Sequence, residues 1–326
     1  MKNILKTKEL GIGAILLLVC IIITLINPVF LTADNLADVL KANAVLGILA
    51  VGMTLIIITG GIDVSVAAVT SAVAVAIGHL MLYLPDHPVS LVVVFAAAVF
   101  AGTLLGMING FFIVKFSIPP IVVTLGTLSI ISGALLFITN GNYMSGANFP
   151  EVFTAFSKYE IFGISILIYI LLFFSLITWG ILKYTVIGRS IYAFGGNSVS
   201  AVRVGISMKK VQYFIYGYMG FLAGIAAVTQ TAYIRAVDPN GLLGFELTVI
   251  AAVVIGGASI LGGNGSIAGT LLGTLLLGVM QNGLILARVD SYWQNLVTGT
   301  VIILAVSYDH LQKKRIDAQT AQIEVK

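Results

Sequence analysis

Long apolar runs separated by short polar stretches fill most of the sequence. Runs of about 20 apolar residues have the length that a helix needs to cross the hydrocarbon core of a bilayer. The pattern predicts an all-α fold, a polytopic membrane helical bundle that forms a single transmembrane domain over residues 1–326. About ten spans are expected, at 10–26, 44–59, 64–84, 89–114, 118–139, 164–182, 211–233, 247–262, 265–287 and 292–307. Eight spans would result if the two glycine-interrupted pairs of runs were re-entrant.

Composition excludes a soluble globular domain. Hydrophobic residues make up 59% of the 326 residues and charged residues only 9%, against roughly 25% charged in soluble domains. The first apolar run follows a basic start and lacks a small-x-small cleavage site. We therefore expect a retained span rather than a signal peptide.

Basic residues are distributed unevenly between the predicted connections. With the N-terminus inside, 13 of the 17 basic residues lie in cytoplasmic segments, whereas eight acidic residues lie in outside segments. The positive-inside rule therefore predicts that both termini are cytoplasmic. Outside, residues 27–43 are expected to add a surface helix capped by Thr32 or Asp34. Residues 140–163 are expected to form a loop followed by a short amphipathic helix.

The longest polar interruption is the segment 183–210, called here the basic loop. It carries five basic residues and no acidic residue. A short helix is predicted over 198–204, between Gly195-Gly196 and Gly205. An ordered, basic loop of this kind indicates a surface presented to a cytoplasmic partner.

Two glycine-rich breaks interrupt apolar runs. In the first break, 59–65, Gly60-Gly61 is followed by Asp63 and Ser65. Ionisable groups at membrane depth tend to face a bundle interior or a water-filled path, and broken helices turn free backbone groups toward such cavities. The alternative is a tight turn in which Asp63 and Ser65 cap the following helix.

The second break, residues 255–266, is dense in glycine and ends in Asn264-Gly265-Ser266. A turn with close packing is its expected role. The chain contains no Gly-Lys-Ser/Thr sequence, so a Walker A loop is absent and we do not expect this chain to bind ATP.

A third segment begins a predicted span with Pro119-Pro120, which the first turn of a helix tolerates. Thr124 and Thr127 follow on one helix face. They either line a polar path or hydrogen-bond to their own helix backbone. Elsewhere, glycines repeat at four-residue spacing, and we expect these faces to pack inside the bundle. The repeats are Gly102-Gly106-Gly110, Gly220-Gly224 and Gly265-Gly269-Gly273.

Catalytic constellations are not suggested by the sequence. The three histidines are scattered and there is one cysteine, so no metal cluster has plausible spacing. The chain is therefore expected to be a non-catalytic membrane subunit.

Four ordered motifs resemble the permease subunits of ATP-binding-cassette importers for ribose and other simple sugars. They are residues 50–65 (AVGMTLIIITGGIDVS), 118–127 (IPPIVVTLGT), 188–206 (GRSIYAFGGNSVSAVRVGI) and 244–257 (GFELTVIAAVVIGG), the last continuing to 269–270. The chain departs from the family pattern at Ala67-Ala68, where Val-Gly is common. It departs again at Thr248-Val249, where Asp-Ala is common, so a carboxylate is missing there.

The resemblance implies a multi-pass protein of the bacterial inner membrane. Its implied partners are two ATPase subunits that bind ATP and Mg, an external sugar-binding protein, and a second permease copy or close paralogue, with membrane lipid around them and no nucleic acid. The basic loop would carry a coupling helix into the ATPases. The matching loop residues are Gly188, Arg189, Ala193, Gly195, Asn197, Ala201 and Gly205. Candidates for the translocation path are Asp63, Ser65, Thr124, Thr127 and Glu246.

Two other functions remain open at this point. An ion-gradient-driven transporter of a neutral solute would use Asp63 as its proton or sodium site and would need no ATPase. A membrane scaffold or receptor would recruit a partner through the basic loop without moving any solute. The identity of the sugar is not predicted.

Overall fold

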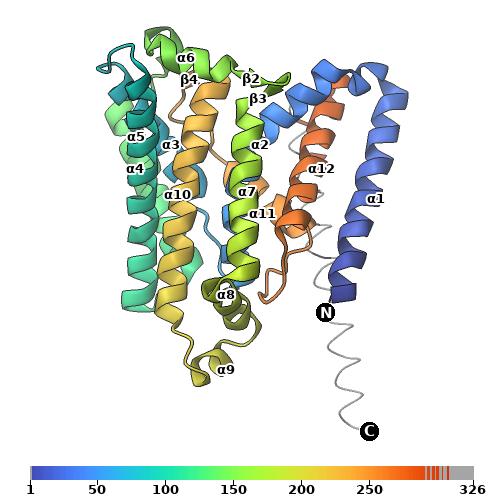
Figure 1. The fold of residues 1–326 in the computed structure, drawn as a ribbon, viewed down its shortest axis with the longest axis vertical. Helices are drawn as coiled ribbons and strands as arrows, with labels where there is room; N and C mark the ends of the chain where they lie inside the picture. Colours follow the sequence, from blue (N-terminus) through green and yellow to red (C-terminus); the bar gives the residue numbers. More distant parts are fainter. Residues whose placement is uncertain are drawn as a thin grey trace.

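The computed structural model describes residues 2–290 and, beyond them, residues 292, 293, 296, 297, 299, 300, 303 and 307, with side chains described from residue 9 onward. The elements are arranged as an upright bundle (Figure 1). The helices are α1 (Lys2–Ile26), α2 (Ala33–Ile58), α3 (Val66–Met81), α4 (Pro88–Phe116), α5 (Pro120–Thr139), α6 (Glu151–Lys158), α7 (Ile166–Tyr184), α8 (Val186–Gly196), α9 (Ser198–Arg203), α10 (Met208–Ile234), α11 (Phe245–Ile255) and α12 (Ile267–Leu286). The short elements are η1 (Pro28–Leu31), η2 (Gly146–Asn148), β1 (Met144–Ser145), β2 (Glu160–Ile161), β3 (Ile164–Ser165) and β4 (Ala236–Val237).

The all-α membrane bundle predicted from the sequence is confirmed. Seven helices of the described part are long and apolar enough to span a membrane, namely α1, α2, α4, α5, α7, α10 and α12. α3 and α11 are apolar but shorter, with 16 and 11 residues. The total of ten spans and the cytoplasmic termini stay predictions, and the expected span 292–307 lies largely outside the described residues.

The predicted span 247–262 is wrong as a continuous helix. α11 ends at Ile255, and at 1.5 Å per residue its 11 residues are about 16 Å long, roughly half of a bilayer core. The backbone then continues without helix to Ser266, with positive φ at Gly257, Gly262 and Gly263. The apolar composition of 247–262 favoured a continuous span and did not indicate that the glycines end the helix.

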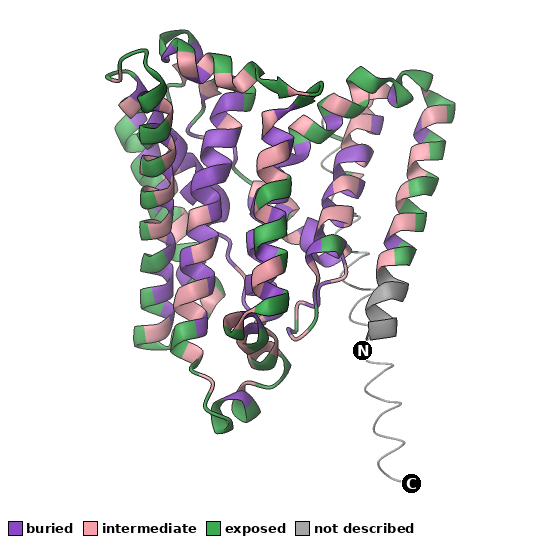
Figure 2. Cartoon of the chain, viewed as in Figure 1, coloured by how far each residue is buried: buried purple, intermediate pink, exposed green. Residues whose placement is uncertain are grey.

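α2 is the central helix of the bundle. In its most apolar 18-residue window 89% of the residues are buried, and α7, α10, α11 and α12 all pack against it. Figure 2 shows the buried residues along the middle helices and exposed ones on the outward faces of α1, α4, α5 and α7. The exposed faces are rich in Leu, Ile, Val and Phe, which suits contact with lipid or with another membrane helix.

Thr32 caps α2, because its hydroxyl accepts the backbone N–H of Asn35 at 3.4 Å. The helix then runs without interruption to Ile58. Residues 33–43 are therefore the first turns of the central helix, and the prediction of a separate surface helix over 27–43 is wrong. A capping signal marks where a helix starts, but it does not show that the helix continues into the following apolar run.

Glycine faces pack inside the chain, as predicted, except that Gly265 precedes α12 and lies in the second break. Gly102 and Gly106 of α4 lie directly against the backbone of α10, where Gly220 and Gly224 leave the matching space. Gly269 and Gly273 of α12 pack in the same way against α11 and Gly256. Any side chain at these contacts would collide with a backbone carbonyl, so the helices approach more closely than larger residues allow.

The two ends of the bundle differ in structure (Figure 1). One end carries α8 and α9 and is called here the loop end. The opposite end carries α6 and the strands, with β1 antiparallel to β4 (Met144↔Val237) and β2 antiparallel to β3 (Glu160↔Ser165). The predicted short amphipathic helix in 140–163 is confirmed as α6, which buries Phe153 and exposes Glu151 and Lys158.

Candidate functional site

The basic loop is built from two helices, of which the sequence predicted one. α9 confirms the short helix predicted over 198–204, and Asn197 caps it by accepting the backbone N–H of Ser200 at 2.9 Å. α8 was not predicted. Thr185 caps it by accepting the backbone N–H of Gly188 at 3.1 Å. α9 lies between Gly195-Gly196 and Gly205 as predicted, and Gly195 and Gly196 are the last residues of α8.

Several of the predicted loop residues shape the loop itself. Gly188 is buried at the corner between α7 and α8, where a Cβ would collide with the carbonyl oxygens of Ile181 and Leu182. Ala201 is buried on α9, and its carbonyl accepts the backbone N–H of Ile206 at 3.0 Å. Gly205 has a φ of +85°, which closes the turn after α9 and favours glycine.

Gly195 joins the basic loop to both breaks. A Cβ at Gly195 would overlap the carbonyl oxygen of Ile58, the last residue of α2. The same carbonyl accepts the backbone N–H of Gly263 at 2.8 Å. The end of α8, the start of the first break and the second break therefore meet at one point, with backbone packed on backbone.

Tyr192 makes a second connection from α8 to the second break. Its hydroxyl donates to the carbonyl oxygen of Gly265 at 2.8 Å. Burial raises the pKa of the Tyr192 phenol above its usual range, so the hydroxyl stays protonated and remains a donor. Two contacts three residues apart, through Tyr192 and Gly195, fix α8 against residues 262–265.

The first break is a tight turn followed by a buried polar group. Gly60 has a φ of +78°, and the backbone N–H of Gly61 returns to the carbonyl of Ile56 at 3.1 Å. One Asp63 oxygen then accepts both the backbone N–H of Ser65 at 2.8 Å and its hydroxyl at 2.6 Å. Ser65 makes no side-chain cap bond to α3. The tight-turn prediction is confirmed, with Asp63 rather than Ser65 accepting the backbone bond before α3.

A chain of hydrogen bonds ties the first break to α4 and α5. The Asn109 amide donates to the Ser65 hydroxyl at 2.8 Å, and the Thr127 hydroxyl donates to the Asn109 carbonyl oxygen at 2.6 Å. The Thr124 hydroxyl accepts the backbone N–H of Val64 at 3.2 Å and lies 3.0 Å from the carbonyl oxygen of Pro120 on its own helix. Both threonines hydrogen-bond to their own helix backbone, which is one of the two alternatives, and the prediction that they line a polar path stays a prediction.

The predicted path residues do not form one open channel within the described chain. Asp63, Ser65 and Thr124 are buried between α3, α4 and α5, and the half-buried Thr127 lies beside them. Glu246 lies apart, in the first turn of α11, with 8% of its surface exposed and one carboxylate oxygen without a hydrogen-bond partner. It lines a cavity of about 10 Å³ with Ser71 and Ser132, which is room for about one water molecule.

Sequence reasoning missed two groups of residues at this site. Asn109 is completely buried and links Ser65 to Thr127. A single Asn inside an apolar run was the signal that could have found it.

The basic loop also exposes apolar side chains, while Arg189 and Ala193 of the predicted set are exposed beside them. These exposed valines are Val186, Val199, Val202 and Val204.

Two helix breaks that meet a packed loop at one end of a membrane bundle are compatible with a transport protein, since transporters contain broken helices. The family described as "Branched-chain amino acid transport system / permease component" matches residues 35–306. The chain belongs to this family of transport-system permeases. No solved structure matches the chain.

Curated relatives are similar to the chain over nearly its whole length. The ribose import permease protein RbsC of Escherichia coli strain K12 is 37% identical over 309 residues, covering 93% of this chain and 94% of the relative. RbsC of Bacillus subtilis strain 168 is 36% identical over 302 residues, covering 93% and 92%. The D-allose transport system permease protein AlsC of Escherichia coli K12 is 35% identical over 289 residues, covering 87% and 86%.

These likenesses establish the class that the sequence motifs indicated. The chain is a sugar-type permease subunit of an ATP-binding-cassette importer. It is a multi-pass protein of a bacterial inner membrane. In this family, ATPase and binding-protein subunits generally complete the transporter.

Proposed function

We propose that this chain translocates a simple, ribose-like monosaccharide. An external binding protein delivers the sugar, and ATP hydrolysis on separate ATPase subunits, which bind the ATP and Mg, drives the transport. Relatives that are 36–37% identical over more than 90% of the chain are ribose import permeases. An allose permease at 35% identity supports a monosaccharide substrate and leaves the particular sugar to experiment.

The basic loop is proposed to be the coupling element. The contact of Gly195 with the Ile58 carbonyl is the observation that carries this proposal, because it links α8 directly to both breaks. A partner that binds differently to two arrangements of α8 and α9 shifts the equilibrium between the corresponding states of the bundle. The hydrogen bonds from Ser65 through Asn109 to Thr127 then extend this linkage to α5.

The low number of buried charges in the bundle is compatible with transport of an uncharged solute. Within the described part of the chain, the buried carboxylates are Asp63 and Glu246, and no lysine or arginine is buried. The other buried polar side chains are Ser, Thr and Asn. Uncharged groups of this kind create no strong field beside the path, whereas a charged substrate requires an opposite charge.

The outward face of α5 is proposed to pack beside a second copy of the chain, with the sugar path between them. Gly126 and Gly133 lie on this face with open space where a side chain would be, and Ser129 is exposed between them. Small and hydroxyl-bearing residues at this spacing favour contact with another helix over contact with acyl chains. Because α5 is hydrogen-bonded to the first break, it would transmit a movement of that break to the sugar path.

Reconstitution into liposomes tests this function. The chain, its ATPase and its binding protein are combined, and uptake of labelled ribose, allose and related sugars is measured with and without ATP. We expect uptake that requires both partners and ATP, and the sugar with the highest uptake identifies the substrate. Uptake that needs an ion gradient but no ATPase would overturn the proposal.

A further inference from the structure

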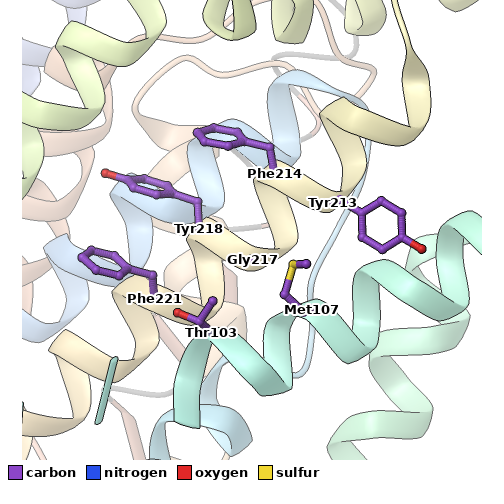
Figure 3. Close-up of a pocket in the computed structure, with 7 residues that line it drawn as sticks. All are labelled: Thr103, Met107, Tyr213, Phe214, Gly217, Tyr218 and Phe221. Carbon is purple, nitrogen blue, oxygen red and sulfur yellow. The ribbon is translucent and has the colours of Figure 1, made fainter. Parts of the chain in front are cut away.

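A groove of about 420 Å³ lies on the bundle between α4 and α10. Thr103 and Met107 form its α4 side, and side chains of α10 form the other side (Figure 3). The α10 residues that line it are Tyr213, Phe214, Gly217, Tyr218 and Phe221. None of these residues belongs to the loop contacts or to the hydrogen-bonded break described above.

Aromatic rings give the groove a flat apolar wall. Phe214 and Tyr218 stack with centroids 5.7 Å apart and an interplanar angle of 8°, and Tyr218 and Phe221 stack at 5.8 Å and 11°. Gly217 contributes no side chain between them, as Figure 3 shows. From Tyr213 to Phe221 the groove follows α10 for about 12 Å. A long, narrow, apolar surface of this shape fits a hydrocarbon chain.

Positive charge lies at one end of the same groove. Lys210 precedes Phe214 by four residues and Lys209 precedes Tyr213 by four, so both lysines stand one helical turn beyond the lining residues. Both side chains are exposed, as is Lys115 near the end of α4. α4 and α10 run antiparallel, with Gly106 against Tyr216 and Gly110 against Tyr213, which brings Lys115 to the same end. Residues 103–125 and 203–221 contain no acidic residue.

We propose that this groove binds an anionic phospholipid. One acyl chain lies along the aromatic wall, and the phosphate contacts Lys209 and Lys210, with Lys115 adding to the positive field. Clusters of basic residues beside membrane helices attract anionic headgroups in this way. A second copy of the chain is a poorer occupant, because a twofold axis along the membrane normal would bring the lysines of both copies together.

The charge part of the proposal is tested by native mass spectrometry of the purified chain titrated with phosphatidylglycerol or phosphatidylcholine. We expect tighter binding of phosphatidylglycerol. The double variant Lys209→Gln, Lys210→Gln should weaken it on the order of tenfold or more and leave phosphatidylcholine little changed. Lys158→Gln is the matched control, since Lys158 is exposed on α6 at the opposite end of the bundle (Figure 1), and this variant should bind phosphatidylglycerol as the parent does.

The acyl-chain part is tested by Thr103→Phe, which fills the groove from its α4 side and keeps all three lysines. We expect this variant to lose bound phospholipid while remaining monodisperse. Equal binding of both lipids by the parent chain, or full retention of phosphatidylglycerol binding by the Lys209→Gln, Lys210→Gln double variant, would overturn the proposal. A dimer that Thr103→Phe dissociates, with no lipid bound in the parent, would assign the groove to a second copy instead.

Discussion

Gly195 of α8 packs directly on the backbone carbonyl of Ile58, the last residue of α2. That carbonyl also accepts the backbone N–H of Gly263 at 2.8 Å. The basic loop therefore touches the end of the central helix and the second break at the same point. Backbone atoms that pack directly on one another cannot move independently, so displacement of α8 must displace one or both breaks.

Asp63 organises the first break, and its removal should impair transport. Asp63→Ala deletes the oxygen that accepts the backbone N–H and hydroxyl of Ser65 at 2.8 and 2.6 Å. A buried donor left unpaired costs about 1–3 kcal/mol. We expect ATP-driven uptake to fall about tenfold or more, the effect of about 1.4 kcal/mol, while ATPase association in a pull-down is retained.

Asp63→Asn separates this structural role from ion coupling. Asparagine keeps a carbonyl oxygen that accepts both Ser65 donors but cannot carry a proton or balance a sodium ion. We expect Asp63→Asn to retain most of the ATP-driven uptake that Asp63→Ala loses. Equal loss in both variants, together with dependence on an ion gradient, would contradict the account and favour the ion-driven alternative.

Much of this architecture could be predicted from hydrophobic periodicity, and the remainder depended on tertiary contacts. Apolar runs located α4, α5, α7 and α10 to within a few residues, because each is a continuous span between polar ends. α8 was missed because its sequence, VIGRSIYAFGG, contains three glycines, which lower helix propensity. Its packing against the breaks stabilises it nonetheless.

The candidate site was also predicted only in part, because some of its contacts join residues that are far apart in the sequence. Asp63, Ser65, Thr124 and Thr127 were chosen as unusual polar residues in apolar surroundings, and they do lie in one cluster. Their joining residue, Asn109, is on a helix 44 positions from Ser65, a distance no local pattern spans. Glu246 is buried too, but it lies in α11, apart from this cluster. The burial of a polar residue does not determine which residues it contacts.

Thr127 holds the hydrogen-bond chain to α5. Thr127→Val keeps the shape of the side chain but removes the donor to the Asn109 oxygen, which is completely buried. We expect the free energy of unfolding in detergent to fall by about 1–3 kcal/mol. Ser129→Ala is the control, because the Ser129 hydroxyl donates to Leu125 on an exposed face, and it should change stability by less than about 0.5 kcal/mol. Equal stabilities of the two variants would show that the hydrogen bond between Thr127 and Asn109 does not stabilise the protein.

Val202 is expected to contact the ATPase. Its side chain is 50% exposed on α9, so Val202→Glu should leave the unfolding midpoint nearly unchanged. A charge buried in an apolar interface is unfavourable, and we expect ATPase affinity in a binding assay to drop about tenfold or more. Ala155→Glu, on exposed α6 at the opposite end, should bind the ATPase normally. Unchanged affinity of Val202→Glu would place the docking surface elsewhere.

The most direct test of the coupling account is ATP-driven sugar uptake by Gly195→Ala and Gly196→Ala in proteoliposomes containing the ATPase and binding protein. A methyl group at Gly195 collides with the Ile58 carbonyl, whereas the space around Gly196 is open. We predict that Gly195→Ala inserts and binds the ATPase but loses nearly all uptake, and that Gly196→Ala retains it. Wild-type uptake by Gly195→Ala would contradict the claim that this contact transmits the movement of the ATPases.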